Sequence, residues 1–236
     1  MGLPGSGKTF IAKKLAKKLN AYWLNADKIR GKYNDWDFSK KGIIRQVKRM
    51  KNLADSSNKK FVIADFVCPM HQQIKIFKPN YIFWMDTIKK SRFSQMNKFF
   101  KKPKYFDLRI KEKNWKINLL LMQDQIINYQ WKNNKSTAQM MGRFQPWHQG
   151  HKKLFEKILM SNNQINIQVK DVKGVGDNPF NFKSIKKKIL KDLQYFKSRI
   201  KITQVPNIMT IYYGRKVGYN FKKINLPKNI QKISAT

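Results

Sequence analysis

One glycine-rich stretch near the start of the chain limits the folds open to this sequence more than any other feature. Residues 2–9 read Gly-Leu-Pro-Gly-Ser-Gly-Lys-Thr and fit the pattern G-x-x-x-x-G-K-[ST]. In this pattern the glycines let the backbone curl, so that successive N–H groups point at phosphate oxygens. The lysine reaches the β- and γ-phosphates, and the threonine hydroxyl is a ligand of Mg²⁺. The sequence therefore predicts that ATP binds at this loop, with Mg²⁺ on Thr9; the residues involved are Gly2, Gly5, Ser6, Gly7, Lys8 and Thr9.

The residues before and after the loop lead to two further predictions, one for a helix and one for a strand. Ile11, Leu15 and Leu19 recur every four residues and predict a helix whose partly positive N-terminal end faces the phosphates. A loop of this kind normally follows a buried strand, but only Met1 precedes it here. We therefore expect that the supporting strand is missing and that the sheet has a gap at its centre.

The charge of the chain is extreme. Its 236 residues include 51 lysines and arginines against 13 aspartates and glutamates, which gives a formal net charge of +38. A polyanion partner is one interpretation of this excess. We prefer a general composition bias, because most of these cations are lysines spread along the chain and bidentate phosphate-binding arginine is sparse. Nonspecific, salt-sensitive binding to nucleic acid is still expected.

Cysteine usage and apolar content indicate the compartment. Cys68 is the single cysteine, which rules out a disulfide within the chain and suits a reducing cytosol. No run approaches the roughly 18 apolar residues of a membrane span, and the N-terminus is no signal peptide. We therefore expect a soluble, cytoplasmic protein without a membrane partner.

Hydrophobic patterning predicts two α/β domains. Apolar runs predict strands at 21–25, 61–66, 81–86, 138–141, 165–169 and 200–205. Apolar stripes predict helices at 43–53, with Ser39 as N-cap, and at 115–131, 150–160 and 182–196. Strands that alternate with helices are typical of a three-layer parallel sheet in a first domain at 1–131. The polar stretch 132–137 is expected to be a linker, and a smaller Rossmann-like domain is expected at 138–236.

Several short motifs follow the glycine-rich loop in the first domain. They are Ala-Asp-Lys-Ile-Arg at 26–30, Asp-Phe-Ser at 37–39 followed by Arg45 and Arg49, Asp-Phe-Val-Cys-Pro at 65–69, Asp86 after a strand, and Phe-Lys-Lys-Pro at 100–103. Together with the loop they resemble the motifs of the adenylylsulfate (APS) kinase family over roughly residues 1–128. The resemblance implies a P-loop kinase fold and transfer of phosphate from ATP to APS, which gives PAPS in sulfate assimilation.

The resemblance also implies roles for five side chains. Asp27 would act on the acceptor hydroxyl or the metal, and the substrate would contact Arg30, Arg45, Arg49 and Cys68. Asp27 follows a strand, where α/β sheets bind ligands, and a cap of the next helix is the alternative. For Arg45 and Arg49 the alternative is a solvated helix face, and for Cys68 it is a small buried residue. Because the segment 86–100 lacks the family's lid, the kinase class is better supported than the acceptor.

A second motif occupies residues 141–151, which read Met-Gly-Arg-Phe-Gln-Pro-Trp-His-Gln-Gly-His. Two imidazoles at the start of a helix can both face nucleotide phosphates, and a glycine between them lets a phosphate approach the backbone. The motif resembles the Gly-x-Phe-x-Pro-x-His-x-Gly-His signature of the HxGH nucleotidyltransferases. The resemblance implies that His148 and His151 are catalytic, and that an NTP, either ATP or CTP, binds at Gly142, Phe144 and Gly150.

The end of the chain carries part of the same resemblance. Residues 233–236 read Ile-Ser-Ala-Thr and are similar to the family's Ile-Ser-x-Thr segment, which implies that Ser234 and Thr236 bind the triphosphate. The chain stops inside this motif as it starts inside the glycine-rich one, so we expect it to be clipped at both ends. Arg215, in a polar loop after a strand, is a further candidate for substrate binding, with an ordinary surface loop as the alternative.

Three hypotheses for function follow from these features. The leading one is an ATP-dependent, APS kinase-like phosphotransferase fused to a nucleotidyltransferase that transfers an NMP and releases pyrophosphate. The second is a kinase of a nucleoside, a sugar or a polynucleotide end, whose product phosphate then receives a nucleotide. The third is a basic nucleic-acid-binding protein with decayed nucleotide sites, and it predicts DNA binding that weakens steeply with salt.

Overall fold

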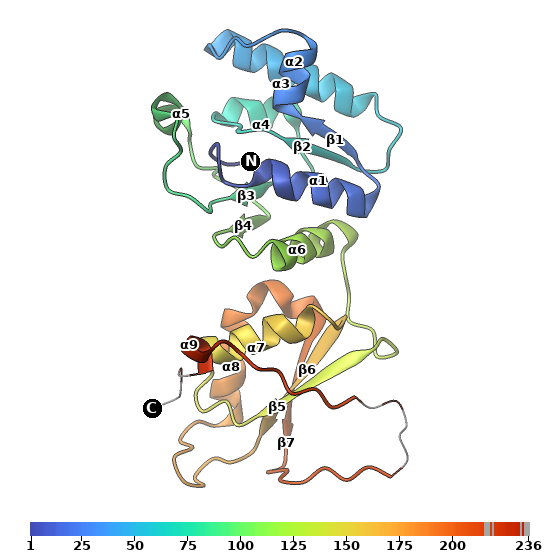
Figure 1. Cartoon of the computed structure of the whole chain (residues 1–236), viewed down its shortest axis with the longest axis vertical. Coiled ribbons are helices and arrows are strands. Elements are labelled where there is room, and N and C mark those ends of the chain that lie inside the picture. Colours follow the sequence, from blue (N-terminus) through green and yellow to red (C-terminus); the bar gives the residue numbers. More distant parts are fainter. Residues whose placement is uncertain (215–217, 219, 232, 234–236) are drawn as a thin grey trace. The chain divides into compact units, whose positions relative to one another are not determined.

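The chain is divided into two compact units. The computed structural model describes residues 1–214, 218, 220–231 and 233. The units are Met1–Asn128 and Tyr129–Thr236, and each combines helices with short parallel strands (Figure 1). The α/β class predicted from the hydrophobic pattern is therefore confirmed for both units.

In the first unit, strands and helices alternate along the chain. They are α1 (Lys8–Leu19), β1 (Tyr22–Asn25), α2 (Ala26–Lys32), α3 (Lys40–Asp55), β2 (Val62–Asp65), α4 (His71–Phe77), β3 (Phe83–Met85), α5 (Ser94–Phe99), β4 (Leu108–Ile110) and α6 (Trp115–Ile127). Ser39 caps α3 as predicted, because its side chain accepts a hydrogen bond from the Gly42 N–H. Helix α6 ends at Ile127, earlier than expected, because Asn128 adopts the left-handed conformation (φ 49°) that stops a helix.

The strands of the first unit form two separate parallel pairs, β1–β2 and β3–β4, in the described chain. Met1 and Gly2 lie between the pairs. The Met1 amine donates to Phe83 O (2.8 Å), Met1 O accepts from Met85 N (2.9 Å), and Gly2 N donates to Val67 O (3.3 Å). Met1 and Gly2 therefore link the two strand pairs, and the glycine-rich loop begins at this position.

The core of the first unit packs on both sides of β1 and β2. Leu24, Ile29 and Met50 are buried together, with Val62, Ala64, Phe66 and Phe77 against them. The predicted stripe of α1 is also buried at Ile11 and Leu15. These contacts hold the ends of β1 and β2 beside the start of α1, and that edge carries the first candidate site.

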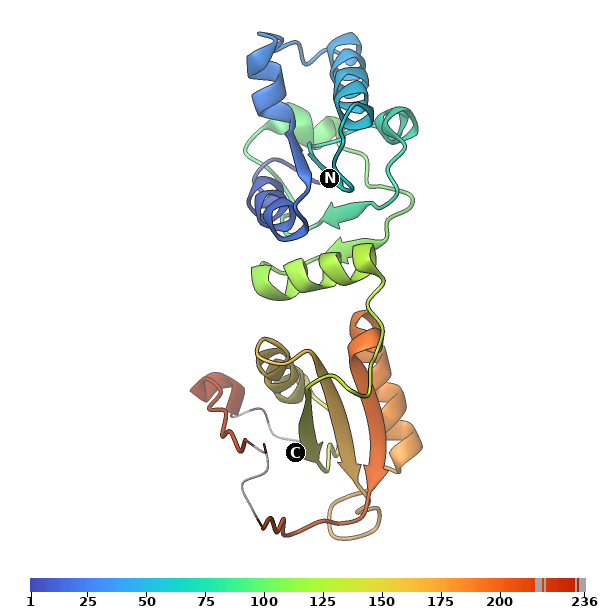
Figure 2. The ribbon, with the colours of Figure 1, turned by 90° about the vertical axis from the view of Figure 1, so that its right-hand side faces the viewer.

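The second unit contains one three-stranded parallel sheet in the order β5-β6-β7. Its elements are β5 (Thr137–Gly142), α7 (Gln149–Leu159), β6 (Gln164–Lys170), α8 (Phe182–Asp192), the 3₁₀ helix η1 (Gln194–Arg199), β7 (Ile200–Val205) and α9 (Lys228–Gln231). Ile165, Ile167 and Val169, alternate residues of the central strand, are almost fully buried, as expected for one face of a sheet that packs against helices (Figure 2). The helix expected at 182–196 changes to 3₁₀ geometry after Leu193.

The boundary between the units lies at Asn128–Tyr129, a few residues before the expected linker at 132–137. Two features attach that stretch to the second unit. The buried side chain of Gln164 accepts from Lys132 N (3.2 Å) and donates to Lys132 O (2.6 Å), and Thr137 begins β5. None of the helices in the described part of the chain has the length and apolar character that a membrane crossing requires.

Candidate functional site

The glycine-rich loop of the first unit forms a turn that leads into α1. Gly5 and Gly7 have positive φ angles of 85° and 87°, a conformation that side chains disfavour, and Gly7 is the N-cap of α1. The first N–H groups of α1 have no acceptor within the helix, as at any helix start. The Ser6 hydroxyl is buried and has no hydrogen-bond partner among the described residues. The loop thus presents the backbone donors that a phosphate would need.

Lys8 folds back over the loop. Its amine donates to Leu3 O at 2.9 Å. Burial lowers the pKa of Lys8, and the nearby carboxylates of Asp65 and Asp27 oppose this shift. A lysine held this way is poised to exchange one carbonyl contact for a phosphate oxygen.

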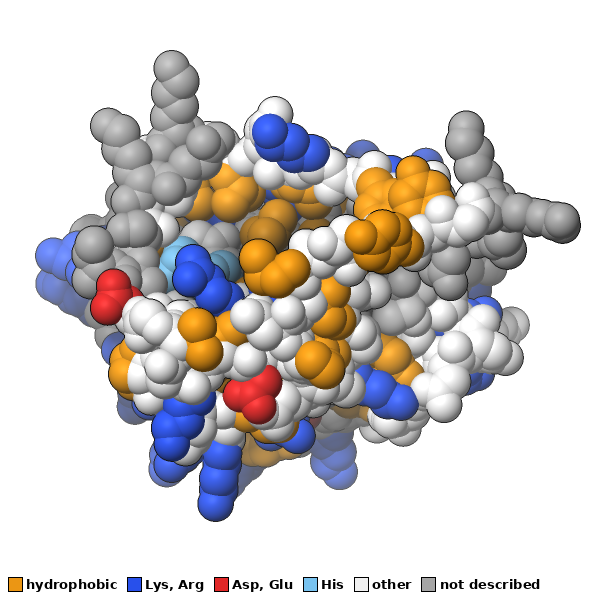
Figure 3. All heavy atoms as spheres, turned by 90° about the horizontal axis from the view of Figure 1, so that it is seen from below, with side chains coloured by type: hydrophobic (Ala, Val, Ile, Leu, Met, Phe, Trp, Pro, Cys, Tyr) orange, Lys and Arg blue, Asp and Glu red, His pale blue; other side chains and the backbone are white. Residues whose placement is uncertain are grey.

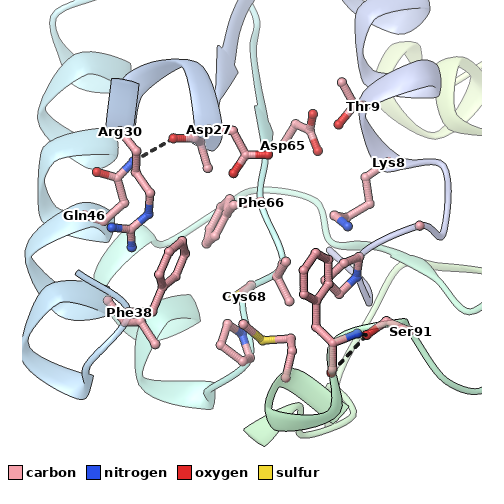
Figure 4. A pocket seen from close by; sticks show the side chains of 18 of the residues that line it. Lys8, Thr9, Asp27, Arg30, Phe38, Gln46, Asp65, Phe66, Cys68 and Ser91 are labelled. Carbon is pink, nitrogen blue, oxygen red and sulfur yellow. Dashed lines mark hydrogen bonds between the residues drawn. The ribbon is translucent and has the colours of Figure 1, made fainter. Parts of the chain in front are cut away.

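A cavity of about 750 Å³ opens beside the loop and joins residues from distant parts of the chain. Lys8 and Thr9 line it from α1, Asp65 from the end of β2, and Asp27 and Arg30 from α2. In Figure 4 the two carboxylates lie between Arg30 on one side and Lys8 and Thr9 on the other. The loop, Asp27 and Arg30, which the sequence assigned to one site, therefore meet in one cavity.

The parallel strands β1 and β2 end side by side, which brings Asp65 at the end of β2 close to Asp27 in the first turn of α2. Asn25 pairs with Asp65 in the register, and Asn25 Nδ2 donates to Asp65 Oδ2 at 2.8 Å. The cap of α2 is Asn25, which accepts from Lys28 N at 3.0 Å, so the alternative of Asp27 as helix cap does not apply. Sequence reasoning missed Asp65 as a site residue, although its position at a strand end was a usable signal.

The three arginines assigned to the substrate separate into two groups. Arg30 is buried, donates to Asp35 O (2.8 Å) and Asp37 O (3.0 Å), and its guanidinium lies 4.6 Å from the Phe38 ring centroid. Arg45 and Arg49 instead bind the Asp35 carboxylate at 2.8 and 2.9 Å. Hydrogen bonds from Arg45 and then Arg49 hold the pKa of Asp35 well below its usual range. In the described chain only Arg30 of the three lines the cavity.

Cys68 lines the cavity but is not poised to react. It is buried, and this burial raises the pKa of its thiol to about 12, so the thiol is protonated at neutral pH. Three phenylalanines and a further arginine that the sequence analysis did not assign also line the cavity: Phe38, Phe66, Phe93 and Arg92. Much of the remaining lining is apolar, and its cations besides Lys8 are Arg30, Lys90 and Arg92.

The second candidate site lies at the start of α7. A Cβ on Gly142 would come within 2.9 Å of the Phe144 ring, so glycine is needed for this ring to pack there. The Phe144 ring contacts His151 edge-on at 5.0 Å between centroids, and the Trp147 ring lies at 5.4 Å. Trp147 Nε1 donates to Asp192 Oδ2 at 2.9 Å, which ties the motif to the end of α8. The histidine side chains lie in a hollow among hydrophobic and basic ones (Figure 3).

His148 and His151 stack on each other and share one hydrogen-bonding pattern. Their ring centroids are 3.8 Å apart. His148 Nδ1 accepts from Gly150 N (3.1 Å), and His151 Nδ1 accepts from His148 N (3.3 Å). A neutral imidazole that accepts at Nδ1 carries its proton on Nε2. The start of α7 therefore presents two Nε2–H donors next to its own positive helix end.

Burial keeps both imidazoles neutral. It lowers the pKa of His151 to about 4, with a smaller contribution from His148. It also lowers the pKa of His148, with a smaller contribution from the Lys188 ammonium. At neutral pH the two rings are thus hydrogen-bond donors without net charge.

We predict that acid weakens the fold through His151. Its folded pKa of about 4 lies below the unfolded value of about 6.5, so the unfolded chain takes up the extra proton between these two pH values. The stabilisation is complete above this window and is lost as pH falls through it. When urea unfolding is measured at a series of pH values, the free energy of unfolding should fall less across this window for His151→Gln than for the wild type. Equal slopes for both proteins inside the window would contradict the prediction.

The Gln145 side chain connects the second motif to the loop that follows β6. Gln145 Nε2 donates to Phe180 O (2.7 Å), and Gln145 Oε1 accepts from Phe180 N (2.9 Å). The loop at 171–181 is therefore attached to the motif by one side-chain amide. Helix α9 lies near the other side of the motif, since Ile230 O is 3.6 Å from a Cβ built on Gly150. Arg215, Ser234 and Thr236, which the sequence assigned to nucleotide or substrate, lie outside the described residues.

Comparison with known proteins gives no family assignment: no protein-family model matches the sequence, and no curated protein matches it. Among the described residues there is also no cluster of three or more histidine, cysteine or acidic side chains that would hold a metal unaided. The case for function rests on the residue types and geometry of the two sites.

Proposed function

We propose that the first unit is an ATP-dependent phosphotransferase and the second a nucleotidyltransferase. The observation that carries the first assignment is the single cavity shared by Lys8, Thr9, Asp27, Asp65 and Arg30. Phosphate transfer needs positioning and neutralisation of charge more than covalent chemistry. A cavity with donors and a lysine at one end, carboxylates in the middle and a buried arginine opposite meets both needs.

The donor would bind with its phosphates on the loop. The backbone N–H groups at the start of α1 would contact the α- and β-phosphates, and the Lys8 amine would contact the β- and γ-phosphates. Mg²⁺ takes oxygen ligands, commonly one or two carboxylates together with substrate phosphates, and the Thr9 hydroxyl with Asp65 fits this preference. Mg²⁺ bound there with ATP would neutralise charge on the phosphates.

The acceptor would occupy the part of the cavity that contains Arg30 and Phe38. Arg30 offers a fixed cation, because two backbone carbonyls and the Phe38 ring hold its guanidinium in place. Phe38, Phe66 and Phe93 offer flat apolar surface, which suits a nucleobase. An acceptor with a base, an anionic group and a hydroxyl fits both features, and APS is such a molecule. The hydroxyl oxygen would attack the γ-phosphorus, its proton would pass to Asp27, and ADP would leave.

In the second unit an NTP would bind at the start of α7. The Nε2–H donors of His148 and His151 and the helix end would contact its phosphates. An acceptor phosphate would attack the α-phosphorus, the bond to the β-phosphate would break, and pyrophosphate would leave. Donors aimed at the charge that builds up in this step are the usual means of accelerating such reactions.

An acceptor panel tests the proposal. The full-length chain is incubated with γ-labelled ATP, Mg²⁺ and one acceptor at a time: APS, nucleosides, sugars or a 5′-hydroxyl oligonucleotide. Transfer to APS is expected, and transfer to another acceptor would keep the phosphotransferase and replace the substrate. In parallel, ATP or CTP with a phosphorylated acceptor should release pyrophosphate. Absence of ATP binding and of any transfer, with DNA binding that falls steeply with salt, would instead favour a basic nucleic-acid-binding protein.

A further inference from the structure

Two aromatic side chains lie beside the glycine-rich loop but outside the cavity. Phe10 follows Thr9 directly, on the first turn of α1, and 49% of its surface is exposed. Trp115 is the first residue of α6, and the two ring centroids are 5.5 Å apart at 55°. Neither residue belongs to the loop's pattern, and neither lines the cavity in the described chain.

Trp115 is in direct contact with the loop backbone. A Cβ built on Gly7 would come within 2.5 Å of the indole Cη2, so the ring lies against the Gly7 backbone. Phe10 extends this aromatic surface along α1, and the Lys14 ammonium lies 4.9 Å from its ring centroid. Such an exposed cation–π contact is weak and easily replaced. The pair therefore forms an accessible aromatic surface directly beside a phosphate site.

The direction of the triphosphate follows from the cavity. The transferred γ-phosphate has to meet the acceptor, so it must lie where Lys8 and Thr9 face Asp27 and Arg30. In this loop pattern the backbone N–H groups hold the α- and β-phosphates while the lysine reaches the β- and γ-phosphates. The α-phosphate and the nucleoside attached to it then lie at the end of the triphosphate that is remote from the acceptor. Trp115, with Phe10 against it, meets the loop at Gly7, and neither ring lines the cavity in which the acceptor would lie.

We propose that the base of the donor nucleotide stacks on the pair formed by Phe10 and Trp115. This inference rests on the proposed phosphotransferase function and adds the residues that bind the nucleoside. Stacking of a base on an aromatic side chain changes affinity by about 10- to 100-fold when the side chain is cut back to alanine. The pair would thus distinguish a nucleoside triphosphate from a bare triphosphate.

The test compares a ligand that has a base with one that has only the phosphates. Dissociation constants of ATP and of inorganic triphosphate, each with Mg²⁺, are measured by titration calorimetry on the full-length chain. Phe10→Ala should weaken ATP binding about 10- to 100-fold and leave triphosphate binding unchanged. Phe10→Tyr and Trp115→Phe, which keep an aromatic ring, should retain ATP affinity near that of the wild type. Phe10 is half exposed, so its replacement is not expected to disturb folding.

The outcomes separate this inference from the function on which it rests. Lys8→Ala should weaken ATP and triphosphate alike, because both use the loop. Suppose that the wild type binds ATP. If Phe10→Ala then binds ATP equally well, or loses the same affinity for ATP and for triphosphate, the stacking proposal is wrong and the phosphate site is retained. If the wild type binds neither ligand, the phosphotransferase proposal fails and the stacking proposal fails with it.

Discussion

Lys8→Ala is expected to lower the rate constant for phosphate transfer from ATP by about 100- to 1000-fold, the usual cost of removing one preorganised donor to developing charge. The expected effect follows from the position of the Lys8 amine. Lys8 is the loop's cation, it lines the cavity with Asp27 and Asp65, and its amine donates a hydrogen bond to Leu3 O. Its desolvated amine interacts more strongly with a phosphate than a surface amine would.

The measurement is single-turnover transfer of label from ATP at saturating Mg²⁺. Lys13→Ala is the matched control, because Lys13 lies exposed on the same helix and carries the same charge. It should react like the wild type. Equal rates of transfer for Lys8→Ala and the wild type would show that Lys8 has no role in phosphate transfer.

His151→Ala and His148→Ala are each expected to lower the rate of pyrophosphate release by about 100- to 1000-fold. Each substitution removes one of the two Nε2–H donors at the start of α7. Each also removes an Nδ1 acceptor, and so leaves the backbone N–H of Gly150 or His148 without its partner. Phosphate transfer from ATP, which we assign to the other unit, should be unchanged.

His71→Ala is the control for these two variants. His71 is the remaining histidine, and it begins α4 in the first unit, away from both motifs in sequence. It should leave pyrophosphate release at the wild-type rate. If the His148 and His151 variants also release pyrophosphate at that rate, the stacked pair is structural and the second assignment is wrong.

The sequence predicted the features that depend on local pattern. The loop at 2–9, the Ser39 cap and the buried alternation of Ile165, Ile167 and Val169 were all readable, because neighbouring residues determine them. The second motif is equally local, since a strand, a turn and the first turn of α7 contain all of it. The short elements β4, α4 and α5 span seven residues or fewer, so they leave too little periodicity to predict.

What the sequence could not show are the contacts that join distant segments. Arg45 and Arg49 fitted a substrate clamp by motif, but the Asp35 carboxylate lies within reach of both and takes their guanidinium groups. Asp65 reaches the cavity only because β2 pairs in parallel with β1. The bond between Gln145 and Phe180 links residues 35 positions apart. Such contacts depend on the packing of the whole unit, which no single motif encodes.

Titration of the full-length chain with ATP in the presence of Mg²⁺ tests the central claim most directly, namely that the glycine-rich loop is a working nucleotide site. The wild type should bind ATP, and Lys8→Ala should lose binding at this site while His151→Ala keeps it. Binding of ATP to Lys8→Ala with wild-type affinity and stoichiometry, or no binding to the wild type at all, would contradict the claim.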